Sequence, residues 1–524
     1  MVNRVLSSDA YTVFLKIILW FLHSRFSFTV FTNHDSLFTT NNPMNLALIG
    51  FILYLAVLIV IGIVSAKSSS EGVGAYFLAG RKLNKWVVAL SAVASGRSAW
   101  LLIGFVGIAY AKGIAALWAA AGYVTVECLM FFFYAPRLRK FTEENDCITI
   151  PDFFAARFGE GSGFLRVLLV IVIAVFMIAY VSAQFVAGGK AFFSSFGIDQ
   201  TTGVVLTALI VLLYTGLGGF VAVSKTDVIQ AICMLFALVV LPIIAVIDIG
   251  GPGVVLANLQ NADPVFFDLQ AVTWGVTLGY LGIGLGSPGN PHILVRFMSI
   301  KKLSELRFAA LIGTFWNVVL ALGAMLVGFT ARAYFPDVAA LPGGDAEQAF
   351  PYLAGQLLQP LLFGLMIAAI FSAIMSSADS QLLVAASGII RDVYQKLLLK
   401  DSEVDERKLV VYSRVAVTLL VLAALLFGFF ATDLVFWLVL FAFGGLGATI
   451  GPTSILGLFW KGTTRAGAIA GVITGGMLIF LWKLVPFFKV SVWNIYELIP
   501  AFIGAFAVTV IVSIFTRKGE RKIE

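Results

Sequence analysis

The sequence predicts an all-α polytopic membrane protein organised around an inverted repeat of five plus five helices. Hydrophobic residues make up 60% of the 524 residues and charged residues only 12%, against roughly 25% charged residues in soluble domains. The apolar residues fall into runs that are long enough to cross a bilayer, for which about 20 residues suffice. Two of these runs break near their middle and lie five runs apart, a spacing that suits such a repeat.

Thirteen apolar runs are candidate membrane spans. They cover residues 46–66, 86–110, 115–136, 164–188, 202–219, 227–249, 274–297, 308–334, 358–390, 410–430, 433–458, 467–486 and 497–516. The run 358–390 is longer than a bilayer requires, so it holds either two pieces or one helix that extends into water. Residues 1–43 are interpreted as an irregular or mis-started extension before Met44; the alternatives are a fourteenth helix or a cleaved signal, although no small-residue cleavage site follows cleanly.

The lysines and arginines are distributed unevenly between the two sides of the predicted membrane. If span 46–66 runs from outside to inside, most of the 35 Lys and Arg residues fall on the inner side, and few fall outside: Lys112, Lys190, Arg332, Lys483 and Lys489. Cytoplasmic loops carry an excess of Lys and Arg. The pattern therefore predicts an outside N-terminus and a cytoplasmic C-terminus in a plasma membrane, such as the bacterial inner membrane.

Composition argues against several classes of protein. Cys128, Cys147 and Cys233 are scattered along the chain, which favours neither a disulfide framework nor a metal cluster. No nucleophile–base pair is evident, so we expect neither an enzyme nor an organic cofactor. The net charge of +7 comes from basic loops and predicts no nucleic-acid partner. The expected partners are a small-molecule solute and the lipid bilayer, with the chain as a monomer or weak homo-oligomer.

Two broken spans indicate where a binding site lies. The window Ala92–Leu102 interrupts its span with small residues and Arg97, and Gly282–Pro291 interrupts the seventh span with glycines and prolines. Exposed backbone in a bilayer is tolerated only where it is buried in protein or lines a cavity. An arginine at that depth costs ~3 kcal/mol or more and usually marks a functional path. Spanning helices broken at mid-depth form the binding sites of secondary transporters.

Other spans also carry groups that lipid would reject. They are Glu127, the run Lys225–Asp227, and the serines and aspartate between Ser372 and Ser380. Hydroxyls and freed carbonyls are ligands for a hard cation such as sodium. Each feature alone has an ordinary structural explanation, because small residues let membrane helices pack closely and Gly-Pro pairs make kinks. Their joint occurrence at matched positions favours a binding site.

Several segments resemble the sodium/solute symporter family, and most closely its sodium/proline symporter branch. Leu217–Gln230 and Trp460–Gly471 resemble the two family signatures, and four further segments resemble the proline branch: Leu90–Ser95, Ile150–Phe158, Pro291–Phe297 and Met375–Leu383. The resemblance extends in order from Met44 to about Arg517. It implies the leucine-transporter fold, with a transport core at 86–460, a first helix and cytoplasmic loop at 44–85, and two peripheral helices with a cytoplasmic tail at 461–524.

The same resemblance implies cation-coupled symport, with sodium as the coupling ion and a small polar organic solute, such as an amino acid or carboxylate, as cargo. Alternating access would move both across the membrane. The matching cation-site positions are the backbone of Ala94 and Arg97, then Ala373, Ser376 and Ser377, with Asp227 assisting.

The chain departs from the proline branch around the expected solute site. Gly96 stands where proline transporters carry an aspartate, and Ile283 and Ser287 replace aromatic residues, so we expect proline to be a poor substrate. The residues expected to contact the solute are Ser98, Trp100, Ser287 and Asn290, with Gln184 in addition. Arg97 has two open interpretations, which are a clamp for an anionic solute and a structural ion pair with Glu127.

Lys225 provides an alternative mechanism. It replaces an aromatic residue two positions before Asp227, and a lysine ammonium in the cation site would stand in for the ion and make the transporter sodium-independent or proton-coupled. The competing interpretation is a lysine that extends to the cytoplasmic surface, because residues two apart on a helix point in different directions. A third hypothesis is a non-transporting sensor on the same scaffold.

Overall fold

The computed structural model describes residues 43–69, 73–159, 161–399, 406–431, 434–485, 487–488 and 495–520. The expectations for the first 42 residues therefore lie outside the described residues. The chain divides into Met1–Leu46 and a compact unit, Ala47–Glu524, and the architecture below is that of the second unit. Its described residues are almost entirely helical, and the only strand-like pairing among them is a bridge between Leu83 and Ile300.

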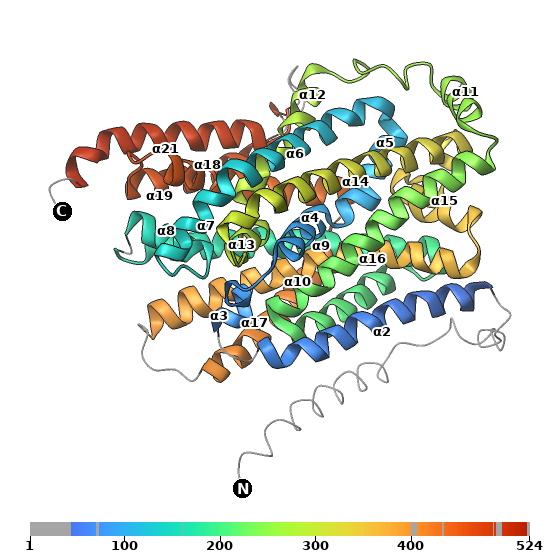
Figure 1. Ribbon diagram of the computed structural model, residues 1–524. Helices are drawn as coiled ribbons and strands as arrows, with labels where there is room; N and C mark the ends of the chain where they lie inside the picture. Colours follow the sequence, from blue (N-terminus) through green and yellow to red (C-terminus); the bar gives the residue numbers. More distant parts are fainter. Residues whose placement is uncertain are drawn as a thin grey trace, which may run out of the picture. The chain divides into compact units, whose positions relative to one another are not determined.

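Long helices follow one another along the whole chain (Figure 1). The principal elements are α2 (Pro43–Ser69), α4 (Lys85–Ala99), η2 (Trp100–Phe105), α5 (Val106–Lys112), α6 (Leu117–Leu129), α7 (Ala135–Glu144), α8 (Ile150–Phe158), α9 (Phe164–Phe196), α10 (Gln200–Asp248), α11 (Pro252–Ala262), α12 (Trp274–Leu281), η5 (Gly282–Gly289), α13 (Pro291–Ser299), α14 (Leu306–Tyr334), α15 (Ala349–Leu357), α16 (Pro360–Ser387), η10 (Gly388–Leu398), α17 (Glu406–Phe429), α18 (Val435–Phe459), α19 (Arg465–Leu484) and α21 (Leu498–Glu520).

Nine helices among the described residues are long and apolar enough to span a membrane. One continuous helical stretch, Lys85–Glu144, contains both predicted spans 86–110 and 115–136. Two further predicted spans correspond to the shorter apolar helices Leu46–Gly62 and Gln200–Thr215. The prediction of an all-α multi-pass protein is confirmed, and the count of thirteen crossings stays a prediction.

Two helical elements are longer than the spans predicted from the sequence. The run 358–390 forms a single helix, because α16 continues without interruption into the π-helical segment η10. Conversely, α10 contains the predicted spans 202–219 and 227–249 in one element, which bends where Gly219 adopts a φ of 57°. A left-handed φ of this kind is available to glycine at little cost, so Gly219 lets the chain turn between the two spans.

Helix α4 occupies the middle of the bundle. Figure 1 shows it among α9, α10, α14 and α16, and it packs against each of them. Every residue from Val88 to Ala99 is buried. A helix that is apolar on all sides is stable only inside a protein or a membrane, so the polar groups of α4 face other helices rather than lipid.

A buried ion cluster connects one end of α9 with α18. Lys190 was expected among the outside basic residues, but α9 extends to Phe196 and Lys190 is buried within it. Its Nζ lies 2.6 Å from both Asp345 Oδ2 and Glu347 Oε2. The Glu347 carboxylate also accepts the backbone N–H groups of Val435 and Phe436 at 3.0 and 2.9 Å. It thereby satisfies the free N–H groups at the start of α18.

We predict that Lys190→Met destabilises the protein by about 3–5 kcal/mol, because it leaves the buried Glu347 carboxylate without its cation. Thermal unfolding of the purified protein in detergent measures the effect. The double variant Lys190→Met with Glu347→Gln should recover part of the loss. Lys140→Met is the matched control: its partner Glu144 is 3.8 Å away and both side chains are exposed, so about 0–1 kcal/mol is expected. Equal effects of the two lysine substitutions would contradict the prediction.

Candidate cation and solute site

The first helix break lies at Ser98, which has a φ of 45°. A left-handed conformation of a non-glycine residue costs on the order of 1–3 kcal/mol and persists only where its surroundings enforce it. Here Gln184 of α9 accepts the N–H of Ala99 through its Oε1 at 3.0 Å. The Ser98 hydroxyl accepts the N–H of Trp100 at 3.1 Å. Protein groups thus replace the helical hydrogen bonds that the break removes.

The second break separates α12 from α13. Between them η5 is a short 3₁₀ segment, and Asn290 is extended with φ −96° and ψ 101°. The Asn290 Nδ2 donates to the carbonyls of Gly286 at 2.8 Å and of Phe443 in α18 at 3.2 Å. A Cβ on Gly289 would lie 2.3 Å from the Leu446 carbonyl oxygen. Glycine is therefore required for the second break to pack directly on α18.

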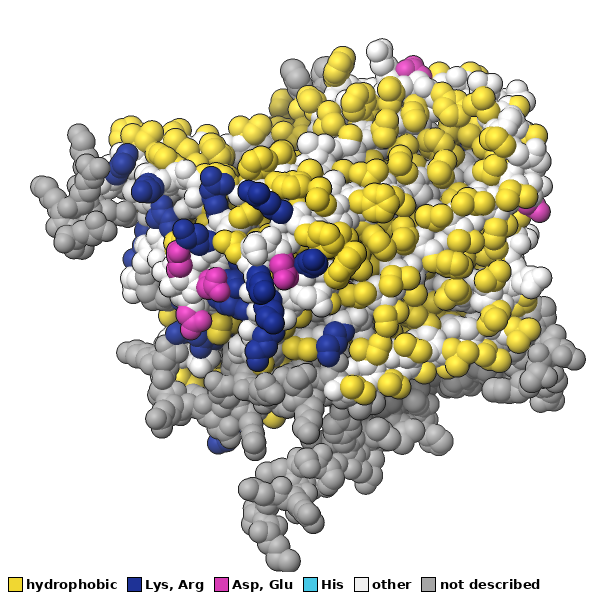
Figure 2. All heavy atoms as spheres, viewed as in Figure 1, with side chains coloured by type: hydrophobic (Ala, Val, Ile, Leu, Met, Phe, Trp, Pro, Cys, Tyr) yellow, Lys and Arg dark blue, Asp and Glu magenta, His cyan; other side chains and the backbone are white. Residues whose placement is uncertain are grey.

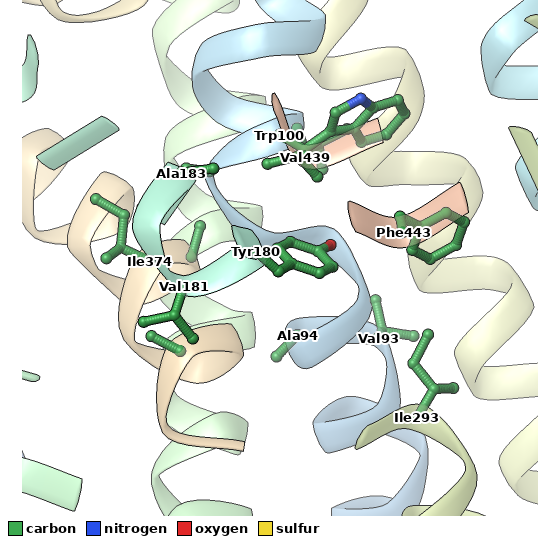
Figure 3. Packing of buried hydrophobic residues seen from close by; sticks show 14 of the residues in the cluster. Val93, Ala94, Trp100, Tyr180, Val181, Ala183, Ile293, Ile374, Val439 and Phe443 are labelled. Atoms are coloured by element: carbon green, nitrogen blue, oxygen red, sulfur yellow. The ribbon is translucent and has the colours of Figure 1, made fainter. Parts of the chain in front are cut away.

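A small cavity lies between the two breaks. Its volume is about 20 Å³, and its walls are Gly96, Arg97, Trp100, Tyr123, Glu127, Tyr180, Ile283, Val439, Leu440 and Phe443. Figure 3 shows three of the aromatic side chains, Trp100, Tyr180 and Phe443, converging on this region from η2, α9 and α18. A single water molecule needs roughly 10–15 Å³ by this measure, so the cavity is nearly closed in this conformation.

Arg97 and Glu127 form a buried ion pair in the cavity wall. The Glu127 carboxylate also accepts Asn317 Nδ2 at 2.7 Å and the Ser287 hydroxyl at 3.4 Å. The guanidinium carbon of Arg97 lies 4.2 Å from the centre of the Tyr123 ring. The structural ion pair that the sequence left open is therefore present. Glu127 accepts hydrogen bonds from three side chains, whereas Arg97 donates to Glu127 through Nη2 alone.

Serine hydroxyls of α16 meet backbone carbonyls of α4 just before the first break. Ser376 Oγ lies 3.1 Å from the Ala94 carbonyl oxygen and 3.2 Å from that of Ala373, and Ser377 Oγ lies 2.9 Å from the Ser95 carbonyl oxygen. These atoms are all oxygens, the donor type that hard cations prefer. The structure thus brings four expected cation-site residues together.

One expected cation ligand is differently engaged. The Arg97 carbonyl accepts the N–H of Trp100 across the break. The sequence analysis did not include Ser95 among the cation ligands. In the structure its carbonyl joins the oxygen cluster, and its hydroxyl donates to the Ser376 carbonyl at 2.8 Å.

Asp227 lies beside this cluster, fully buried. Its Oδ2 accepts the hydroxyls of Ser91 at 2.5 Å and Ser95 at 3.3 Å, and Arg296 Nη2 at 2.9 Å. Arg296 also contacts the Ser380 hydroxyl. The sequence analysis did not single out Arg296, whose side chain is fully buried on α13.

Lys225 does not reach the cluster. It is exposed, whereas Asp227 is buried. Residues two apart on a helix point in different directions, so the burial of Asp227 turns Lys225 away from the site. This contradicts the placement on which the lysine-surrogate hypothesis depends.

Of the residues expected to contact solute, Trp100 alone lines the cavity. Ser98, Gln184 and Asn290 hold the two helix breaks, and Ser287 contacts Glu127. The sequence analysis missed the aromatic wall residues Tyr123, Tyr180 and Phe443. No local signal distinguishes them from ordinary core aromatics, because buried tyrosines and phenylalanines are common throughout this helical bundle.

Comparison with known proteins agrees with this architecture. Residues 76–475 match the family model described as "Sodium:solute symporter family". Two Staphylococcus aureus proteins named sodium/proline symporter, from strains bovine RF122 / ET3-1 and NCTC 8325 / PS 47, are each 36% identical over 472 residues, 89% of this chain and 92% of theirs. A solved Na⁺-coupled sialic acid symporter, substrate-bound and outward-open, is 19% identical with a TM-score of 0.75, covering 90% of this chain and 98% of that one. The predicted leucine-transporter-type fold is confirmed.

We predict that Gln184→Leu destabilises the protein by about 1–3 kcal/mol, because the buried Ala99 N–H loses its acceptor. Thermal unfolding in detergent measures the effect. Gln200→Leu, which changes an exposed glutamine at the start of α10, is the control and should have little effect. A loss as large in Gln200→Leu as in Gln184→Leu would refute this role for Gln184.

Proposed function

The chain belongs to the sodium:solute symporter family. From this premise we propose that the oxygen cluster binds sodium and that the neighbouring cavity binds the solute. The protein is a multi-pass membrane transporter that moves a small solute together with sodium. Its relatives at 36% identity are sodium/proline symporters, and it shares the fold of a Na⁺-coupled sialic acid symporter. The function is therefore transport rather than catalysis of a chemical reaction.

We propose that sodium binds among the oxygens that join α4 to α16. The ligands are the Ser376 and Ser377 hydroxyls with the carbonyls of Ala94 and Ala373, and Ser95 supplies a further carbonyl. The Arg97 carbonyl joins when its bond to the Trp100 N–H opens. Asp227 assists at a distance, because its carboxylate accepts the Ser95 hydroxyl, which also contacts the Ser376 carbonyl.

The observation that carries the coupling is the shared helix break. Ala94 and Ser95 face the serines of α16, whereas Arg97 and Trp100, only a few residues further along, line the solute cavity. A cation that draws α4 toward α16 therefore also changes the position of the cavity wall. Each sodium that moves inward contributes ~2.3 kcal/mol per 100 mV of membrane potential, which drives the solute uphill by alternating access.

We propose the membrane orientation with the N-terminus outside and the C-terminus in the cytoplasm of a bacterial inner membrane. Figure 2 shows Lys and Arg side chains gathered at one end of the visible face, next to a broad apolar surface. An excess of these residues characterises the cytoplasmic side. Within this arrangement the transport core is 86–460, flanked by 44–85 and 461–524, and the protein acts as a monomer or weak homo-oligomer.

We predict that Ser376→Ala and Ser377→Ala each raise the half-saturating sodium concentration about ten-fold, since each removes an oxygen ligand worth about 1.4 kcal/mol or more. The assay is thermal stabilisation of the purified protein by NaCl, with choline chloride keeping the ionic strength constant. Ser387→Ala is the control, because among the described residues this buried serine of α16 bonds only the Val384 carbonyl of its own helix. Lys225→Ala should also leave the sodium response unchanged. A response lost in Lys225→Ala and kept in both serine variants would overturn the assignment.

A further inference from the structure

We propose that the transported solute is a short monocarboxylate without an amino group, held through its carboxylate by Arg97. The proposal rests on the proposed function, because it specifies the solute of that same cavity. The cavity wall contains one cation, Arg97, and one carboxylate, Glu127, and its other residues are uncharged. The hydrogen bonds that these two side chains already make determine which charge a ligand must bring.

Glu127 is occupied by the protein itself. Its Oε1 accepts Arg97 and the Ser287 hydroxyl, and its Oε2 accepts Asn317 Nδ2. These donors come from α4, η5 and α14, so the carboxylate is held from three elements. It joins the two halves of the predicted repeat and offers little to an incoming donor such as an ammonium group.

Arg97 has hydrogen-bonding capacity left. A guanidinium carries five N–H donors in a planar fork, and Glu127 engages only Nη2. The Nε is buried and has no hydrogen-bond partner within the described part of the chain. One face of the guanidinium lies over the Tyr123 ring, so a ligand would meet it along the edge that carries the unpartnered Nε. A planar carboxylate matches that edge, because arginine–carboxylate pairs are frequently bidentate.

An amino acid fits this arrangement poorly. Its ammonium would lie in a closed cavity next to the guanidinium, with Glu127 already committed to three donors. Gly96 adds no polar side chain to the wall, and a Cβ there would lie 3.8 Å from Glu127 Oε1. A buried ammonium without an acceptor is strongly disfavoured. The cavity therefore discriminates against zwitterions that carry the same carboxylate.

The remaining walls specify a small apolar body. Ile283, Val439 and Leu440 are aliphatic, Trp100 and Phe443 add aromatic surface, and Tyr123 and Tyr180 add aromatic rings that carry hydroxyl groups. The cavity volume of about 20 Å³ leaves room for little more than a water molecule until the helices separate. These features favour a small acid, whose chain lies on the apolar walls while its carboxylate meets Arg97.

The test compares solutes with one three-carbon skeleton. Thermal unfolding of the full-length protein in detergent is measured in NaCl and in choline chloride with propionate, lactate, alanine and lactamide, and with proline. A ligand that binds only the folded state raises the unfolding temperature. We expect propionate and lactate to raise it in sodium, and alanine, proline and lactamide to leave it unchanged. A larger shift with alanine or proline than with propionate would overturn the proposal.

Two variants test the role of Arg97. Arg97→Lys keeps the charge and loses the fork, so at least ten-fold more propionate should be needed for the same shift. Arg97→Gln combined with Glu127→Gln removes both buried charges together, which avoids an unpaired carboxylate, and should abolish the response. The matched control is Arg332→Gln, since Arg332 also lies over a tyrosine ring, 5.1 Å from the centre of Tyr110, but outside the cavity wall. An unchanged propionate response in the double variant contradicts the proposal.

The comparison of NaCl with choline chloride distinguishes a failure of the monocarboxylate proposal from a failure of the proposed function. Sodium-dependent stabilisation by alanine or proline would keep the symporter and overturn the monocarboxylate. Stabilisation by propionate that is equal in sodium and choline would support the monocarboxylate and contradict sodium coupling. A shift with sodium alone and with none of the five solutes would overturn the monocarboxylate while leaving the sodium site intact.

Discussion

The rest of the structure depends on the need to satisfy backbone groups where α4 breaks inside an apolar core. A helix that opens at mid-depth frees N–H and carbonyl groups that lipid cannot satisfy. Here the Gln184 side chain accepts a hydrogen bond from the Ala99 N–H, and the Ser98 hydroxyl accepts one from the Trp100 N–H. With these donors satisfied, the carbonyls of Ala94 and Ser95 face the serines of α16. The break therefore positions both the oxygen cluster and the wall of the neighbouring cavity.

Buried charges connect the elements around this break. Arg97 on α4 pairs with Glu127 on α6, and Arg296 on α13 pairs with Asp227 on α10. Removing one partner of a buried pair is strongly destabilising, because the remaining charge is uncompensated. Such pairs are weak evidence for net stability, but they restrict which helices can lie together. The Arg296–Asp227 pair links the second broken helix to the neighbourhood of the oxygen cluster, so the two halves of the fold meet at the proposed sodium site.

The two sites differ in what they require of their residues. The oxygen cluster uses backbone carbonyls and serine hydroxyls, which suit a hard cation whatever the solute. The cavity is lined by Arg97, Glu127 and aromatic side chains, which under the proposed function would select a solute by charge and shape. A scaffold of this kind can therefore keep its coupling ion while its solute changes through a few substitutions. Gly96 and Ile283, which the sequence analysis contrasts with the proline branch, both lie in the cavity wall.

The sequence by itself determined the class of protein and both helix breaks, and its family resemblance implied most of the oxygen cluster. The local signals are the apolar runs, the windows Ala92–Leu102 and Gly282–Pro291, and the serine pair Ser376 and Ser377. Such signals can be recognised in the sequence without knowledge of the fold. Tertiary structure alone decided that Asp227 turns inward and Lys225 outward. It also decided that Tyr180 and Phe443 line a cavity. The physical reason is that helices packed inside a membrane bundle carry little amphipathic signal, so only their packing partners determine which face meets the site.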